Sequence, residues 1–477
     1  MDRRRFLSSS ALAALALSLP APATPQNEAG AISIEKFGAS PANSAAAHTR
    51  AINAAIAAVE DDAGLTTVYF PAKRYACGNI RVRRGRLVLS MEGCTLHGSG
   101  VRFSVDPEAS DVRVLGGHWI ETSGRRSTYL FTVNGERIEI IGTTFEKAPA
   151  AYGGYMGYVR AGTKDCLFDR FHFRGGNGIY IEGEGHQFTN FTIEAAPPPG
   201  GDDSFAIKAI AGVTSGIRIG PGRIKNYAAV ISIGSEIGTL GKDDPRHSKV
   251  VRDVIVRNIV AEACSHVALI KPGAISAYDY RDGLVEDVLI ENVTLSDPTG
   301  ARFQRGIAVT AARGAQVRRV TSRNVRIRAR AYKGTGIPTV GAMDCYIVDY
   351  PGGTAAFLSD IDLQASYSDP YDGKANAPAT PGHPVQYIAR AALQTPGKGQ
   401  MQDITFDVEG NGCKEIGILI GEGLDGAVEV KRAVLTNISV DPSSTLGRGG
   451  IFFRSRVKLG DLYIQAVNGS RLAGPVH

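Results

Sequence analysis

Tryptophan and cysteine are scarce in this chain of 477 residues: there is one tryptophan, and the six cysteines form no CxxC pair. Since no histidine cluster accompanies the cysteines, the sequence predicts no zinc site and thiols that serve as small buried side chains. No block of five or six like charges occurs, which argues against a tail that binds nucleic acid. Beyond the N-terminus, no run is long and apolar enough to cross a membrane. What remains is ordinary globular composition, with 43% hydrophobic and 21% charged residues.

The N-terminus has the three parts of an export signal. Arginines at 3–5 precede a short apolar stretch at 11–19, and Ala21-Pro22-Ala23 follows as a small-x-small cleavage site. The arginines resemble a twin-arginine signal, with an ordinary secretory signal as the alternative. We therefore predict a signal peptide at residues 1–23, read by the twin-arginine export machinery, a linker at 24–31, and a periplasmic or secreted protein.

One amphipathic helix is expected near the start of the mature chain. Between Ser44 and Val59, apolar residues recur at helical spacing, and Ser44 or Asn43 can cap the N-terminal end. A β-type run at 67–70 then ends at Pro71. Few helices are expected afterwards.

From Tyr75 onward the sequence consists of short β-type runs broken by Gly, Asn, Asp or Pro, such as RIEIIGTTF, GIYIEG and VEDVLIENVTL. Equivalent runs recur roughly every 20–35 residues, which indicates a solenoid whose units bury their apolar faces against their neighbours. Strands this short, with almost no helix, favour a parallel β-helix over a β-sandwich or a propeller. The predicted fold is all-β: one β-helix domain over residues 32–477, with the helix covering one open end.

Four blocks follow one another in the order found in a known family. They are GDDSFAIKA at 201–209, ISIGSEIG at 231–238, VRDVIVRNIV at 251–260 and LIKPG at 269–273. The series resembles the polygalacturonases, family 28 of the glycoside hydrolases, and the start of the chain resembles other pectate-lyase-like proteins. The resemblance covers residues 32–300. It implies a single-stranded, right-handed parallel β-helix that hydrolyses glycosidic bonds.

The active-site blocks of that family are unevenly matched. The aspartate pair is present as Asp202 and Asp203. Asn177 stands where the resemblance implies a third aspartate, and Ala229 where it implies a histidine. In Leu269-Ile270-Lys271, the lysine of an Arg-Ile-Lys block is kept and the arginine is not. The arginine and lysine are implied to hold a uronate carboxylate, so polygalacturonate is not carried over as the substrate.

Adjacent carboxylates suit acid–base chemistry. Repulsion between like charges raises the pKa of one of them, so it can donate a proton to a leaving oxygen while another carboxylate activates water. The resemblance implies Asp202 as the acid and Asp203 as part of the base set; a Gly-Asp turn without catalytic role is the alternative. Because successive strand residues point to opposite faces, both carboxylates reach one cleft only if a turn or bulge lies at the pair.

Four further residues are predicted to bind substrate: Asn177, Tyr180, Glu236 and Lys271. Tyr180 offers an aromatic face to a sugar ring, and Lys271 offers a cation to an anionic or hydroxyl-rich ligand. Glu182 and Glu184 are expected to be solvated turn residues.

The leading hypothesis is an exported glycosidase that acts on a polysaccharide or oligosaccharide through Asp202 and Asp203, with no metal or other cofactor. Two alternatives stay open. One is a lyase or epimerase acting on a uronate polymer, with Lys271 as the base and, for a lyase, a calcium ion as cofactor. The other is a carbohydrate-binding β-helix without catalytic activity. No nucleic-acid partner is expected, and the sequence leaves the oligomeric state open.

Overall fold

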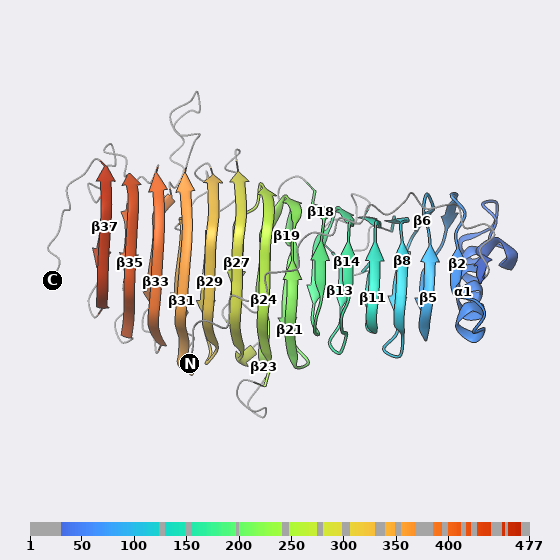
Figure 1. The fold of residues 1–477 in the computed structure, drawn as a ribbon, viewed down its shortest axis with the longest axis horizontal. Coiled ribbons are helices and arrows are strands. Elements are labelled where there is room, and N and C mark those ends of the chain that lie inside the picture. Colours follow the sequence, from blue (N-terminus) through green and yellow to red (C-terminus); the bar gives the residue numbers. More distant parts are fainter. Residues whose placement is uncertain are drawn as a thin grey trace, which may run out of the picture.

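The short β-type runs form strands that lie side by side along one axis, each paired with the equivalent strand of the next coil (Figure 1). The structure is a computed structural model that describes residues 30–123, 129–147, 154–196, 200–240, 248–273, 280–297, 306–329, 339–348, 354–368, 385–393, 399–411, 416–420, 427–439, 451–453 and 457–468. The predicted signal peptide at 1–23 and most of the predicted linker lie outside this part of the chain. Within it, every strand pairing is parallel except that of β23 (Tyr227–Leu240) with β26 (Tyr280–Asp282). The predicted solenoid of parallel strands is confirmed.

The first of the two sheets begins as two separate columns of short strands. One column contains β1 (Ala31–Ser33), β2 (Thr67–Tyr69), β5 (Gly85–Ser90), β8 (Ser110–Leu115), β11 (Glu136–Ile141), β14 (Leu167–Asp169), β17 (Gln187–Thr189) and β21 (Val213–Ile219). The other contains β3 (Arg74–Ala76), β6 (Thr95–Gly98), β9 (His118–Glu121), β12 (Thr144–Lys147), β15 (His172–Arg174), β18 (Phe191–Glu194) and β22 (Gly222–Lys225).

The two columns merge at one strand, β24 (Val250–Glu262), which pairs with β21 along its first part and with β22 along its second. Long strands then continue the merged column: β27 (Leu284–Asp297), β29 (Gln316–Ala329), β31 (Ala356–Ser368), β33 (Gly399–Asn411), β35 (Ala427–Ser439) and β37 (Val457–Asn468). Residues with positive φ, such as Asp253 and Asn258, bend these strands where the earlier coils have turns.

The second sheet forms the remaining wall and holds the candidate site. In chain order its main path contains β4 (Asn79–Val82), β7 (Arg102–Val105), β10 (Phe131–Val133), β13 (Tyr155–Val159), β16 (Asn177–Ile181), β20 (Phe205–Ala209), β23, β25 (His266–Ile270), β28 (Gly306–Ala311), β30 (Thr339–Ile347), β32 (Val385–Leu393), β34 (Ile416–Ile420) and β36 (Ile451–Phe453). The short strand β19 (Gly201–Asp203) pairs with β23 beside this path.

Large side chains stack in register inside the solenoid. Trp119, Phe145 and Phe173 occupy equivalent positions on successive coils and are all buried. Their ring centroids are 6.3 and 5.5 Å apart along the stack. Ile193 and Ile224 continue the same line on the next two coils. The five cysteines that the structure describes are buried, as the sequence predicted, and none of these five forms a disulfide.

The predicted helix is confirmed as α1 (Ala45–Asp61), which follows the short 3-10 helix η2 (Ile34–Phe37). Ser44 is its N-cap, and the Ser44 hydroxyl accepts a hydrogen bond from the backbone N–H of Ala47 at 3.3 Å. Its buried face contains Ala51, Ile52, Ala55, Ile56 and Val59. The helix lies at the N-terminal end of the solenoid (Figure 1).

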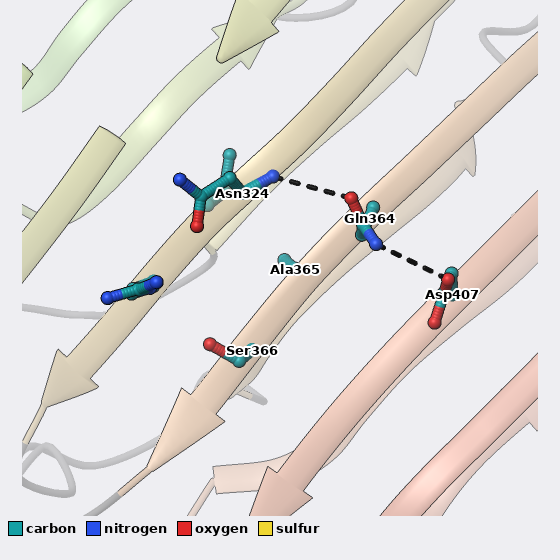
Figure 2. A pocket seen from close by; sticks show the side chains of 7 residues that line it. Asn324, Gln364, Ala365, Ser366 and Asp407 are labelled. Atoms are coloured by element: carbon teal, nitrogen blue, oxygen red, sulfur yellow. Dashed lines mark hydrogen bonds between the residues drawn. The ribbon is translucent and has the colours of Figure 1, made fainter. Parts of the chain in front are cut away.

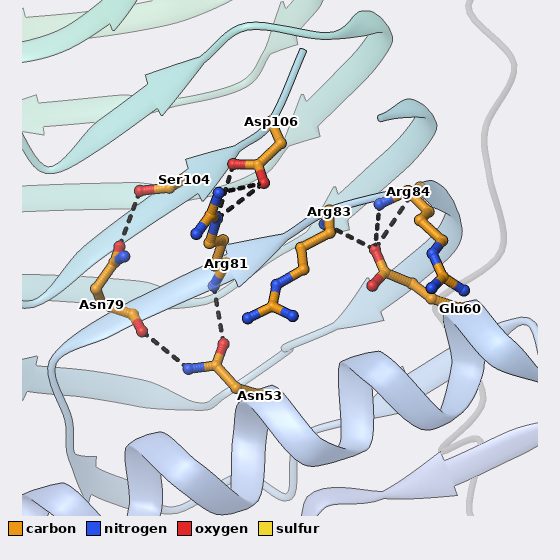
Figure 3. Close-up of polar contacts among 9 residues, drawn as sticks. Asn53, Glu60, Asn79, Arg81, Arg83, Arg84, Ser104 and Asp106 are labelled. Carbon is orange, nitrogen blue, oxygen red and sulfur yellow. Dashed lines mark hydrogen bonds and ion pairs between the residues drawn. The ribbon is translucent and has the colours of Figure 1, made fainter. Parts of the chain in front are cut away.

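Polar side chains of α1 replace the missing neighbour of strand β4 (Figure 3). The Asn53 amide donates to the carbonyl of Asn79 at 3.0 Å and accepts from the N–H of Arg81 at 2.9 Å, as a further strand would. The Glu60 carboxylate accepts from the N–H groups of Arg83 and Arg84 at 2.8 and 2.7 Å. The helix therefore closes an edge that would otherwise be open to pairing with another chain.

We expect Asn53→Ala to lower the free energy of unfolding by about 1–3 kcal/mol, because it leaves two backbone groups of β4 without partners. The midpoint of urea unfolding measures the effect. Arg50→Ala, on the exposed side of the same helix, is the control and should change stability by less than about 0.5 kcal/mol. Equal midpoints for the two variants would contradict this role of Asn53.

Candidate active site

The aspartate pair lies at a break in a strand of the second sheet. Asp202 and Asp203 end β19, and β20 begins at Phe205 after the intervening Ser204. Asp202 is exposed, whereas Asp203 is only 3% exposed. The two neighbouring carboxylates therefore differ in their access to solvent.

Asn177 and Tyr155 hold Asp202 from the two preceding coils. The Asn177 side-chain oxygen accepts a hydrogen bond from the backbone N–H of Asp202 at 2.8 Å. The Tyr155 hydroxyl donates to the Asp202 carboxylate at 3.3 Å. Burial, together with Asp203 and Asp202, raises the pKa of Tyr155, so its hydroxyl remains a donor. Asn177 thus fixes the backbone at Asp202 without adding a third negative charge beside the pair.

Asp203 is buried among charged groups of both signs. Burial raises the pKa of its carboxyl to about 6, against the lowering effect of Lys271. The negative charge of Asp202 adds to the rise, and Lys208 opposes it. Asp203 therefore exchanges its proton at a pH far closer to neutrality than an exposed aspartate does.

Two buried polar atoms beside the pair lack a hydrogen-bond partner among the described residues: Asp203 Oδ1 and Ser232 Oγ. The Ser232 hydroxyl is near enough to act on the Asp203 carboxyl. Buried polar atoms are almost always paired in folded proteins, and each exception has to be explained. Asp203 and Ser232 therefore keep hydrogen-bonding capacity that the described residues do not fully use.

The predicted site residue Tyr180 lies within an aromatic cluster. Its ring stacks on that of Tyr155, with centroids 3.8 Å apart and an angle of 20° between the planes. Tyr158 and Tyr129 lie 5.9 and 6.4 Å from it. The ammonium nitrogen of Lys208 lies 5.2 Å from its centroid. Tyr180 therefore lies between Tyr155, which donates to Asp202, and the ammonium of Lys208.

Lys208 is a member of the site that the sequence did not identify. It is buried and forms an ion pair with Glu236, which was predicted as a site residue. The strand register shifts at Lys208, since Ile207 pairs with Ile233 whereas Ala209 pairs with Ile237. On the following coil, Lys271 comes directly after Ile270, the partner of Ile233. Lys271 is half-buried and forms no ion pair with the residues that the structure describes. The site therefore holds two lysines, one of them neutralised.

His266 is the second residue that sequence reasoning missed. The family resemblance implied a histidine at Ala229, which is in register with Asp203 on one side and with His266 on the other. His266 is 7% exposed, and its Nδ1 lies 3.1 Å from the carbonyl oxygen of Ala228. The next coil thus places an imidazole on the same line, one step beyond Ala229.

The expectation of a solvated turn at Glu182 was wrong. Glu182 is only 2% exposed and accepts three hydrogen bonds, from the Tyr158 hydroxyl at 2.5 Å and from the N–H groups of Ile210 and Ala211 at 2.9 and 3.2 Å. Its carboxylate thus links residues 210–211, which follow β20, to the preceding coil, which contains β16. Glu182 is therefore a structural carboxylate beside the site.

Away from the aspartate pair, a hollow lies on the first sheet, lined by Asn324, Gln364 and Asp407 among others (Figure 2). Gln364 accepts from the N–H of Asn324 and donates to Asp407, both at 3.4 Å. Asn324 also donates to Asn292 at 2.7 Å, which extends a ladder of amides along the sheet. These groups satisfy one another across the strands, and no buried orphan atom accompanies them among the described residues.

Over the ranges that the structure describes, no group of three or more His, Cys, Asp or Glu is arranged to hold a metal ion. The described helices include none with the length and apolar character needed to span a membrane.

The arrangement of coils is similar to that of known carbohydrate-processing proteins. A family 28 exopolygalacturonase from Yersinia enterocolitica aligns over 92% of this chain and 78% of its own, at 13% identity and a TM-score of 0.53. The tailspike protein of E. coli bacteriophage HK620, in complex with a pentasaccharide, aligns over 90% of this chain and 80% of its own, at 14% identity and a TM-score of 0.55. The fold is a right-handed parallel β-helix. No sequence-family model and no curated protein matches the chain.

Asp203 should make the protein less stable at neutral pH than at acid pH. Its folded-state pKa of about 6 exceeds the ordinary value of 3.8, so the folded protein binds the proton more tightly and stability falls as pH rises between these values. We expect Asp203→Asn, which resembles the protonated acid, to raise the free energy of unfolding at pH 7.5 by about 1–3 kcal/mol.

Urea unfolding at pH 4 and pH 7.5 measures this difference. The gain should vanish at pH 4, where Asp203 of the unchanged protein is largely protonated. The exposed neighbour serves as the control: Asp202→Asn should shift stability by less than about 0.5 kcal/mol at either pH. A loss of stability in Asp203→Asn at both pH values would argue against the raised pKa.

Proposed function

We propose that this protein is an exported glycoside hydrolase that cleaves a polysaccharide or oligosaccharide at the Asp202–Asp203 centre. One observation carries the proposal: a buried carboxyl with a raised pKa lies directly beside an exposed carboxyl, in a cluster of tyrosines and lysines. Proteins with the same fold include an exopolygalacturonase and a tailspike that binds a pentasaccharide. The predicted export signal at residues 1–23 belongs to this proposal.

The proposed chemistry uses the difference between the two aspartates. Asp203 retains a proton up to a pH of about 6 because burial disfavours its charge. Asp202 lies at the surface, where a glycosidic oxygen can reach it, and Tyr155 and Asn177 fix its position. The pair then supplies the proton that the leaving oxygen needs, which is the acid half of glycoside hydrolysis.

Lys271 and the tyrosines support substrate binding in the same proposal. Lys271 offers a half-buried cation whose charge acts on Asp203 but which forms no ion pair within the described ranges, and this suits an anionic or hydroxyl-rich sugar. Tyrosine rings in this region supply apolar surface for sugar rings. A lyase would use Lys271 as a base instead, and the product distinguishes the two reactions.

We expect the protein to release reducing ends from at least one of polygalacturonate, alginate, xylan and a bacterial O-antigen polysaccharide. No ultraviolet absorbance of an unsaturated uronate should accompany them, since hydrolysis forms no double bond. Asp202→Asn and Asp203→Asn should each lower kcat roughly 10²–10⁴-fold, because each removes part of the acid centre.

Glu108→Gln is the control, as Glu108 is an exposed carboxylate in the turn between β7 and β8, and the kcat of this variant should equal that of the unchanged protein. Unsaturated products would show that the protein is a lyase and not a hydrolase. Full activity in both aspartate variants would refute the proposed centre.

A further inference from the structure

Lys208 connects groups on both sides of the aspartate pair. Its side chain comes from β20 and is 6% exposed, and its ammonium pairs with the Glu236 carboxylate on the neighbouring strand β23. The Glu236 side chain is 23% exposed. A buried cation thus holds a carboxylate that still reaches solvent.

The path of Lys208 depends on a glycine. A Cβ at Gly234 would lie 2.5 Å from the Lys208 nitrogen and 3.0 Å from the adjacent carbon, closer than real Cβ contacts. Any larger residue at 234 would force the end of the Lys208 side chain to shift from this position. The glycine within ISIGSEIG is therefore matched to the lysine one coil before it.

The same ammonium acts on the acid centre. It lies 5.2 Å from the Tyr180 ring, which stacks on Tyr155, the donor to Asp202. It is also among the cations that lower the pKa of Asp203. Burial raises the pKa of Tyr180, and the charges of Glu236 and Asp202 add to the rise, so both carboxylates lie near this tyrosine. Glu236 is thus part of the same electrostatic cluster as the aspartates.

We propose that Glu236 is the catalytic base of the hydrolysis and that Lys208 is the residue that positions it. The proposal rests on the proposed glycosidase function. The Lys208 ammonium favours the ionised form of the Glu236 carboxylate, which is the form a base requires. Glu236 also takes the place of the carboxylate that Asn177 cannot supply, since Asn177 has no ionisable group.

Hydrolysis then proceeds by a single displacement at the anomeric carbon. A water oxygen forms a bond to the anomeric carbon and passes its proton to the Glu236 carboxylate. The bond between the anomeric carbon and the glycosidic oxygen breaks, and that oxygen takes the proton held by the aspartate pair. Solvent then removes the proton from Glu236 and restores it to the pair. The product has the inverted anomeric configuration, because water attacks the face opposite to the leaving group.

The test uses the whole protein and whichever polysaccharide of the panel it hydrolyses. Glu236→Ala should lower kcat at least about 100-fold. Added sodium azide should restore part of that rate, at least about tenfold, because a small anion can attack without a base. Azide should restore nothing in Asp203→Ala, which lacks the acid. Proton NMR of the first product should show inversion.

Lys208→Met tests the positioning role through the pH profile of kcat. Activity should be lost on the alkaline side as Asp203 gives up its proton. Removing the ammonium raises the pKa of Asp203, so this limb should move to higher pH by at least about half a unit. A residue that only stabilises the fold would lower kcat at all pH values without moving the limb. Lys208→Arg keeps the cation and should leave the limb near its original place.

The chain offers a matched control in Lys225 and Glu262, an exposed ion pair at 3.1 Å on neighbouring strands of the other sheet. Lys225→Met and Glu262→Ala should leave kcat, its pH profile and its response to azide unchanged. Far-ultraviolet circular dichroism identifies any variant that fails to fold, and Glu236→Gln then replaces Glu236→Ala for the kcat measurement.

The outcomes separate the two claims. If the unchanged protein hydrolyses its substrate and Glu236→Gln keeps more than half of kcat, Glu236 is not the base, while the glycosidase function stands. Retained anomeric configuration would likewise overturn the role of Glu236 as a base. If the unchanged protein hydrolyses no polysaccharide of the panel, the proposed function fails and the role of Glu236 fails with it.

Discussion

Hydrogen bonding between equivalent strands of successive coils is the constraint on which the rest of this structure depends. Each strand is fixed by the one before it, so a side chain lies about 4.8 Å from its counterpart on the next coil. Residues far apart in sequence thus become neighbours along straight lines. The aromatic stack inside the solenoid and the polar line of Asp203, Ala229 and His266 outside it are products of the same register.

The same pairing creates a problem at the first coil, where a strand has no predecessor. Asn53 and Glu60 of α1 solve it with side-chain groups that reproduce the donors and acceptors of a strand. The site lies many coils away from this end, where β16, β20 and β23 are paired on both sides and the short β19 is paired with β23. Rigid neighbours on each side let the fold keep a charged, partly unsatisfied cluster in a fixed geometry.

The sequence predicted the features that depend on local pattern. Helical spacing and the Ser44 cap identified α1, and recurring short apolar runs identified the parallel solenoid. The Gly-Gly-Asp-Asp stretch pointed to the aspartate pair. His266 and Lys208 were missed because their places depend on register. The chain takes 26 residues from Asp203 to Ala229 and 37 from Ala229 to His266. Such unequal coil lengths hide which residues lie in register. The burial of Glu182 was missed as well, because its hydrogen-bond partners, Tyr158, Ile210 and Ala211, are distant in sequence.

Burying the carboxyl of Asp203 costs folding free energy, and this cost is an argument for a functional role. A carboxyl at the position of Asp203 is desolvated, repelled by Asp202 and left with one oxygen unpaired among the described residues, although two lysines partly offset its charge. A neutral asparagine there would avoid the charge altogether. Amide ladders elsewhere on the same protein show that its strands readily accommodate asparagine at paired positions. Burying an acid where the fold can carry a neutral amide therefore supports the proposed role of Asp203 as a group that exchanges a proton.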